Sequence, residues 1–435
     1  MLALRRFIFS IRWQSLIAPW QQVDLPLFAL TIGITLFGGI SIRSAELNQG
    51  ITDWWQHWLF GGIGLVLALV IARCRYEYLM RWHWSIYGIT NLSLIAVMVA
   101  GYSAKGAQRW ISVGGFNLQP SEFAKVGVII TLAALLQSKT AAKIPNLVRA
   151  LIVTAVPWLL VFVQPDLGTS LVFGAITLGM LYWGNANPGW IVLLVSPLVA
   201  VILFNLFLPA WVIWAVVVGA IAWLTLPWRW LGTIAAVAIN FLAGELGHIL
   251  WGVLKDYQKD RLILFLNPEK DPLGGGYHLI QSRIAIGSGQ LWGQGLYHGT
   301  QTQLNFIPEQ HTDFIFSAVG EEWGFVGSLV LLFVFWLMCL RLILIAQTAK
   351  DNFGSLLASG VFAMMVFQVI LNISMTIGLA PVTGIPLPFM SYGRSALLTN
   401  FIAIGIVQSV ANHRQRKGLG NKTQIPKFRN GLSYK

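Results

Sequence analysis

The sequence predicts an all-α polytopic membrane protein with about 10 to 12 transmembrane helices, and three observations support this fold class. Hydrophobic residues make up 56% of the 435 residues and charged residues only 10%, whereas a soluble globular protein carries roughly 25% charged residues. Apolar runs of about the 20 residues needed to cross a bilayer recur from Leu25 almost to the end of the chain. Lys and Arg residues concentrate in alternate connecting segments. The membrane domain is therefore the bulk of the protein.

Twelve apolar runs have the length and composition of membrane-spanning helices. Pro209 interrupts the apolar stretch between the seventh and eighth runs, so two helices and one broken hairpin both fit there. Three prolines between residues 380 and 395 predict a rigid re-entry at the last outer turn. The predicted spans are residues 25–43, 56–73, 84–102, 123–137, 147–163, 169–185, 189–208, 210–226, 229–254, 314–345, 354–379 and 388–411.

The distribution of basic residues predicts the orientation of these spans. With the N-terminus in the cytoplasm, most of the 29 Lys and Arg residues fall on the cytoplasmic side, as the positive-inside rule requires. Both termini are therefore expected in the cytoplasm. A juxtamembrane segment, residues 1–24, precedes a single membrane domain, residues 25–411, and a basic tail, residues 412–435, follows it. The longest connection, residues 255–312, is expected outside, and loops of this length are usually functional.

The net charge and the cysteine content exclude other classes of protein. The formal net charge of +13 follows from membrane topology, because no basic patch interleaved with aromatic residues lies on a soluble module. We therefore expect no nucleic-acid partner. The two cysteines, Cys74 and Cys339, lie near cytoplasmic ends of predicted spans, and two such residues provide neither a disulfide framework nor a thiolate metal site.

Asp271 is the most conspicuous polar residue of the outer loop. It lies between Pro268 and Pro272 and shortly before three consecutive glycines, so the backbone is restrained on one side and open to a ligand on the other. A carboxylate held in this way can act as a general base or as a metal ligand. The local sequence also fits a second interpretation, in which Asp271 only caps a turn.

The outer loop leads into a second cluster of titratable residues. Residues 309–322 contain four carboxylates and His311. Ionisable groups at a membrane surface are costly to keep unless they bind or react. They can instead be caps, because Asp313 falls near a helix start, where negative charge is stabilised. For His311 and Asp313 the sequence leaves both interpretations open.

An earlier outer segment adds basic residues to the same face. Lys105 and Arg109 precede the fourth predicted span, and Lys125 lies one turn inside it. A lysine within a membrane span is a functional candidate, although an ion pair with Glu122 at i,i+3 would also explain its presence. Asp166 lies at the junction of the fifth and sixth spans, where a capping role and a ligand role are both open.

Six ordered motifs resemble those of the SEDS family (shape, elongation, division and sporulation). The similarity covers nearly the whole chain. Two details resemble the elongation branch, RodA, rather than the division branch: His278 follows Gly276 and Tyr277, and residues 299–304 precede the motif that begins at Pro308. The motifs are residues 106–110, 119–125, 164–169, 271–289, 308–322 and 386–395.

The resemblance implies a glycosyltransferase that polymerises lipid II, an undecaprenyl-pyrophosphate disaccharide-peptide, on the outer face of the bacterial cytoplasmic membrane during elongation and cell-shape maintenance. It implies a class B penicillin-binding transpeptidase and other elongation-complex membrane proteins as partners. Asp271 matches the family's essential loop carboxylate and is expected to be the base, or the ligand of a divalent cation, Mg²⁺ or Mn²⁺. Substrate-binding roles are expected for residues in or beside the motifs: Arg109, Lys125, Lys105, Gln281, Ser282, His311 and Asp313.

The chain departs from the family pattern, and two other functions compete with polymerisation. Relatives usually have ten spans, and the apolar stretch 190–249 is long enough to add two. Arg394, Gln290 and Gln294 stand where Gly, Gly and Lys are commoner, which changes the local groove and its phosphate contacts. A lipid II flippase would need polar groups at the midplane of several helices, whereas most candidate charges here lie at the outer surface. A scaffold would only activate its transpeptidase partner.

Overall fold

The computed structural model describes residues 20, 22–48, 53–104, 107–113, 116–253, 264–265, 268–272, 274 and 276–414. The predicted juxtamembrane segment before residue 20, the basic tail after residue 414 and Lys105 lie outside the described residues. So does most of the outer loop between residues 254 and 275. The expectations made for these segments stay predictions.

Twelve long helices form the bundle within the described part of the chain, one for each predicted span. Ten are long and apolar enough to cross a membrane, and α7 and the apolar part of α8 are slightly shorter. The chain is thus a multi-pass membrane protein, and the break at Pro209 separates two helices. The helices are α2 (Leu25–Glu46), α3 (Asp53–Arg73), α4 (Glu77–Ala100), α5 (Pro120–Ser138), α6 (Ile144–Val163), α7 (Leu167–Trp183), α8 (Pro188–Leu206), α9 (Leu208–Thr225), α10 (Arg229–Val253), α14 (Ile315–Thr348), α15 (Asn352–Ile377) and α16 (Arg394–Asn412).

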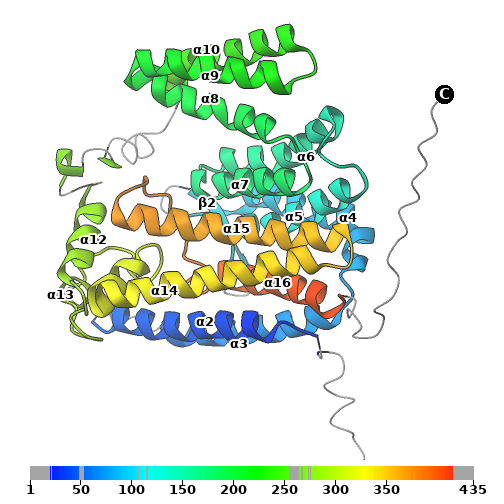
Figure 1. Cartoon of the computed structure of the whole chain (residues 1–435). Helices are drawn as coiled ribbons and strands as arrows, with labels where there is room; N and C mark the ends of the chain where they lie inside the picture. Colours follow the sequence, from blue (N-terminus) through cyan, green and yellow to red (C-terminus); the bar gives the residue numbers. More distant parts are fainter. Residues whose placement is uncertain are drawn as a thin grey trace, which may run out of the picture.

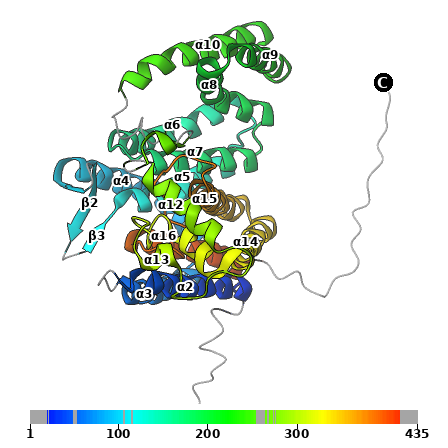
Figure 2. The ribbon, with the colours of Figure 1, turned by 90° about the vertical axis from the view of Figure 1, so that its left-hand side faces the viewer.

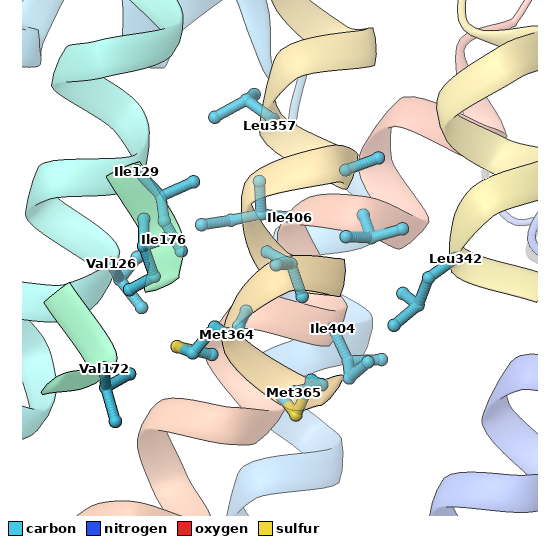
Figure 3. Packing of buried hydrophobic residues seen from close by; sticks show 14 of the residues in the cluster. Val126, Ile129, Val172, Ile176, Leu342, Leu357, Met364, Met365, Ile404 and Ile406 are labelled. Atoms are coloured by element: carbon cyan, nitrogen blue, oxygen red, sulfur yellow. The ribbon is translucent and has the colours of Figure 1, made fainter. Parts of the chain in front are cut away.

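The long helices lie roughly side by side in layers (Figures 1 and 2). The hairpin of α2 and α3 covers one side, and α3 packs along α16. The middle of the bundle holds α15, which contacts α5, α7 and α14. Figure 3 shows this core, where Ile129 of α5 and Ile176 of α7 face Met364 of α15. The helices α8, α9 and α10 pack mainly on one another at the far side of the bundle.

The two ends of the described chain meet at one end of the bundle, which we call the terminal end. The backbone amide of Asp24 donates to Gln408, and Arg341 donates to the Asp24 carboxylate. At the opposite end, which we call the loop end, the short helices α12 (Tyr277–Ser288) and α13 (Thr300–Gln303) close over α14 and α2 (Figure 1). The end of α2 contacts this layer through a hydrogen bond from Gln303 to the Ser44 carbonyl, 3.1 Å long.

The connections differ from the sequence prediction in three respects. Three short antiparallel strands, β1 (Tyr102–Ala104), β2 (Ala107–Val113) and β3 (Phe116–Leu118), form a sheet where only an outer segment was predicted. The predicted outer loop, residues 255–312, contains α12 and α13. The last helix begins at residue 394 instead of 388, because the prolines of residues 380–395 keep the preceding segment non-helical. The predicted rigid re-entry is confirmed.

Candidate active site

A cavity of about 410 Å³ opens between the helix ends and connections of the bundle. This volume is in the range of small-molecule sites. Its wall combines the β2–β3 hairpin and the start of α5, the start of α7, the segment before α14, and the non-helical segment before α16. The lining residues are Arg109, Trp110, Asn117, Gln119, Glu122, Lys125, Asp166, Thr169, Val172, Glu309, Thr312, Asp313, Thr383, Gly384, Ile385, Pro386, Tyr392, Gly393, Ser395 and Ala396.

Lys125 and Glu122 form an ion pair in the cavity wall. The lysine Nζ lies 2.9 and 2.8 Å from the two carboxylate oxygens of Glu122. Lys125 is only 1% exposed and Glu122 only 3%. The sequence predicted either this i,i+3 ion pair or a functional lysine. The ion pair is present and borders the cavity, and the functional role of Lys125 stays a prediction. A buried pair stays charged only because its partners compensate each other.

Arg109 and Asp166 form a second pair of opposite charges on the same wall. The guanidinium Nη1 lies 3.7 Å from Asp166 Oδ1, and the arginine also donates to the carbonyls of Gln164 and Pro165. Asp166 caps α7, because it accepts from the amide of Thr169 at 3.2 Å. The capping role predicted as one alternative is thus present. Asp166 thus both caps α7 and contacts Arg109, which lines the cavity.

Asp313 reaches the cavity beside the segment that precedes α16. The side-chain amide of Asn372 donates to the carbonyls of Asp313 and Ile385, at 2.9 and 2.8 Å, and so ties the two segments together. Gly384 has a φ of +72°, a left-handed conformation that favours glycine. A Cβ at Gly384 would lie 3.4 Å from Asp313 Oδ2, so the carboxylate lies directly against this turn.

The structure brings three of the predicted site residues to the cavity, namely Arg109, Lys125 and Asp313. The remaining described ones lie outside its lining. Asp271 is exposed and accepts a 3.0 Å hydrogen bond from the Gly274 amide, which is the turn geometry of the second interpretation. Gln281 lies half-buried on α12. None of these positions tests the predicted roles.

Ser282 and the two buried glutamates of α14 hold the loop end together. Ser282 is fully buried and donates to the Thr376 carbonyl of α15 at 2.6 Å. Glu321 accepts from the amides of Gln301 and Thr302, both at 2.8 Å, at the start of α13. Glu322 accepts from Ser44 of α2. Glu321 thus caps α13, whereas Glu322 joins α14 to α2.

Tyr392 connects the cavity with His311. Tyr392 lines the cavity, its ring lies 5.9 Å from the imidazole of His311, and its amide donates to the His311 carbonyl at 3.0 Å. Burial raises the pKa of the Tyr392 hydroxyl above its ordinary value, and hydrogen bonding by Arg394 partly offsets this rise. The hydroxyl therefore stays protonated at neutral pH and can donate.

The family model described as "Cell cycle protein", whose name combines FtsW, RodA and SpoVE, matches residues 22–217 and 190–416. The chain belongs to this family. The peptidoglycan glycosyltransferase MrdB of Escherichia coli K12 is 39% identical over 400 residues, which cover 91% of this chain and 96% of that protein. The peptidoglycan glycosyltransferase RodA of Treponema pallidum is 34% identical over 428 residues and 91% of this chain. The predicted SEDS membership and RodA branch are confirmed.

A solved structure has the same fold. It is entitled "Structural coordination of polymerization and crosslinking by a peptidoglycan synthase complex", and its chain matches with a TM-score of 0.70 at 27% identity. The match covers 91% of the present chain and all of the other. The polytopic helical fold predicted from the sequence is thus confirmed in this member of the family.

Several polar residues of the loop end were not selected from the sequence. Glu309, Thr312, Thr383 and Tyr392 line the cavity. Glu309, Thr312 and Tyr392 fall inside motifs of the family, and these motifs could have pointed to them. Thr383 lies outside the motifs. Glu46 lies at the end of α2 with no motif around it, and only a carboxylate at a span end could have drawn attention to it.

Proposed function

We propose that this chain is a peptidoglycan glycosyltransferase of the RodA branch, which polymerises lipid II, and that the cavity is where the reacting ends of its substrates bind. The observation that carries the proposal is the convergence of two cations and four carboxylates on one cavity, from segments far apart in the sequence. These residues are Arg109, Lys125, Glu122, Asp166, Glu309 and Asp313. The names of the relatives supply the substrate class.

The cations suit the leaving group of this reaction. Transfer of a glycosyl unit from an undecaprenyl-pyrophosphate donor releases a pyrophosphate, whose developing charge must be stabilised. Arg109 and Lys125 provide charge-assisted donors for phosphate oxygens. Both are already paired with carboxylates, so a bound pyrophosphate would compete for donors that Glu122 and Asp166 hold in position. The anionic partners therefore preorganise the site.

The acceptor needs a base, and we assign this role to Asp271. The sugar hydroxyl must lose its proton as it attacks the anomeric carbon. Asp271 lies in the segment that leads into α12, and α12 packs on α14 and α15, whose neighbouring segments line the cavity. Glu309 and Asp313 are the carboxylates that line the cavity from the segment before α14. We propose that they orient the acceptor.

A divalent cation, Mg²⁺ or Mn²⁺, is a further part of the proposal. Within the described residues, no group of three or more His, Cys, Asp and Glu side chains includes Asp271. A cation bound there would therefore take most of its ligands from water and from the substrate pyrophosphate, as Mg²⁺ commonly does. It would neutralise charge on the leaving group.

Membrane sidedness and partners complete the proposal. We place both termini in the cytoplasm and the loop end outside, because the basic residues follow the positive-inside rule and the described chain ends meet at the terminal end. The similar solved chain comes from a complex described as coordinating polymerisation and crosslinking. We therefore propose a class B penicillin-binding transpeptidase as partner, within a larger elongation complex.

The test is polymerisation of labelled lipid II by the purified chain with its transpeptidase partner. Asp271→Asn keeps the shape of the side chain and removes the base, so we expect glycan-strand synthesis to fall by at least about 100-fold. Glu269→Gln is the matched control, because Glu269 is an exposed carboxylate of the same segment. It should polymerise at the wild-type rate.

Each outcome separates the competing functions. Wild-type synthesis with an inactive, folded Asp271→Asn variant supports the proposal. Equal synthesis by both removes Asp271 from the chemistry. If the wild-type complex makes no strands but the chain moves lipid II across vesicles, the flippase function replaces polymerisation. Stimulation of the transpeptidase alone would favour the scaffold.

A further inference from the structure

A second cluster of metal-ligating side chains lies at the loop end, apart from Asp271. Glu46, Asp53 and His311 each direct one ligand atom into a space where these atoms lie within 4.8 Å of one another. The three residues come from the end of α2, the start of α3 and the segment before α14. None of them lines the cavity, and the proposed glycosyl transfer assigns none of them a role.

The two carboxylate oxygens of Glu46 differ in their hydrogen bonding. Its Oε2 atom accepts from the backbone amides of Asp53 and Trp54, at 2.9 and 3.0 Å, and so caps the first turn of α3. Its Oε1 atom is buried and has no hydrogen-bond partner within the described part of the chain. The residue is only 2% exposed. Burying a carboxylate oxygen without a partner costs free energy that a bound cation would recover.

The charges of the cluster also favour a cation. Glu46 and Asp53 place two carboxylates close together, and like charges at this distance repel. Among the described residues, no Lys or Arg forms an ion pair with either of them. The nearby guanidinium of Arg43 lies over the ring of Trp54, 5.1 Å from its centroid.

Neighbouring hydrogen bonds hold the candidate ligands in place. Gln56 donates to Asp53 Oδ1 at 3.1 Å, and Tyr392 donates to Gln56 Oε1 at 3.2 Å. Arg394 in turn donates to the Tyr392 hydroxyl at 2.9 Å. Such outer partners fix the orientation of ligating carboxylates in metal sites. The chain of bonds runs from the cluster to Tyr392, and therefore to the cavity wall.

We propose that Glu46, Asp53 and His311 bind a divalent transition-metal ion of the Mn²⁺ or Zn²⁺ class. Two carboxylates and one imidazole suit these ions, whereas Mg²⁺ and Ca²⁺ favour oxygen ligands alone. Water would complete the coordination. The ion joins α2 and α3 to the segment before α14, and it braces the cavity wall through Gln56 and Tyr392.

The test measures metal binding directly and needs no lipid substrate. The full-length chain is purified in detergent and stripped with a chelator. Mn²⁺ is then titrated while the free ion is followed by electron paramagnetic resonance. We expect one tightly bound Mn²⁺ per chain, released by equimolar Zn²⁺ and retained when Mg²⁺ is added, because Zn²⁺ binds such donors more strongly than Mn²⁺.

Variants assign the bound ion to a site. Glu46→Gln and Asp53→Asn should each raise the dissociation constant at least about tenfold, since the loss of even an outer-shell partner has this effect. Glu269→Gln, an exposed carboxylate in the segment before α12, is the control and should bind as the wild type does. Monodisperse elution of each variant confirms that it is folded. If Glu46→Gln fails to fold, the dissociation constant of Asp53→Asn alone tests whether the ion binds at this cluster.

Three results would overturn the proposal. The first is the absence of bound Mn²⁺ and Zn²⁺ in the wild type. The second is unchanged binding in the Glu46 and Asp53 variants. The third is binding that disappears in Asp271→Asn but not in Glu46→Gln, which would assign the ion to the glycosyl-transfer site. A failure of polymerisation would leave this measurement unaffected.

Discussion

Buried carboxylates serve different purposes in the cavity and at the contact between α13 and α14. Glu321 is fully buried and accepts from the backbone amides of Gln301 and Thr302, so its charge is used in holding α13 on α14. Glu122 is almost as buried, but its partner is the Lys125 ammonium, and the pair borders an open cavity. The comparison shows that burial alone does not identify a functional carboxylate. A functional carboxylate is identified by the group that donates to it and by the presence of a cavity beside it.

The kink in α14 lies just after Glu321 and Glu322. Gly324 has a φ of +64° and interrupts the helix. The carbonyls of Glu321 and Glu322, just before the kink, accept from the amides of Gln294 and Gly295 at 3.0 Å. The chain before α14 is thereby anchored on one side, and the preceding residues Glu309 and Asp313 reach the cavity.

The largest effect on the polymerisation rate is expected from a substitution of Arg109. We predict that Arg109→Gln lowers the rate of glycan-strand synthesis by at least about 100-fold, because a charge-assisted contact to the pyrophosphate disappears. The fold should survive, since Asp166 still accepts from Thr169 and Gln119. Labelled lipid II polymerisation measures the rate. Wild-type synthesis by the variant would exclude Arg109 from phosphate binding.

A substitution at the contact between α13 and α14 should lower the stability of the fold and leave the polymerisation rate nearly unchanged. Glu321→Ala leaves several buried donors without an acceptor, so we expect a loss of about 3 kcal/mol in the free energy of unfolding. The thermal unfolding midpoint in detergent should fall accordingly. At a temperature where the variant is folded, its polymerisation rate should stay within threefold of the wild type. An unchanged midpoint would contradict the anchoring role.

Tyr392 allows a prediction about pH. Its pKa is raised by burial above its value of about 10 in the unfolded chain. Its contribution to stability is therefore fully present below that pH and is lost only as the pH rises through the higher native pKa. Tyr392→Phe should lower the rate by about tenfold through the lost bond to Gln56. It should leave the shape of the pH–rate profile between pH 6 and 9 unchanged, and a new inflection in that range would refute this.

The smallest expected effect is at Gln290. Its φ of +48° is a left-handed conformation that costs a residue with a side chain about 1 kcal/mol. Gln290→Gly relieves this strain. We expect the free energy of unfolding to rise by at most about 1 kcal/mol, because glycine also gains freedom in the unfolded chain. A lower unfolding midpoint would show that the side chain of Gln290 contributes more than its strain costs.

The spans were predictable because each one satisfies a local requirement for about 20 apolar residues. The pairing of Lys125 with Glu122 was also predictable from the sequence, because i,i+3 neighbours on a helix lie on the same face. The strands around Arg109 were not, because they are short and belong to a small sheet of three strands. The cluster of Glu46 and His311 depends on contacts between distant segments, which no local pattern encodes.

We place glycosyl transfer in the cavity beside Lys125 and Glu122. Removal of one charge alone would leave the other buried without a partner and destabilise the fold. The double variant Glu122→Gln, Lys125→Gln removes both charges and keeps side chains of similar volume in place.

The decisive measurement is the initial rate of glycan-strand formation from labelled lipid II by this double variant and its transpeptidase partner. Thermal unfolding of the same sample is recorded in parallel. We predict a fall in the rate of at least about 100-fold, with an unfolding midpoint close to the wild type. A folded double variant that polymerises lipid II at the wild-type rate would exclude this ion pair from glycosyl transfer.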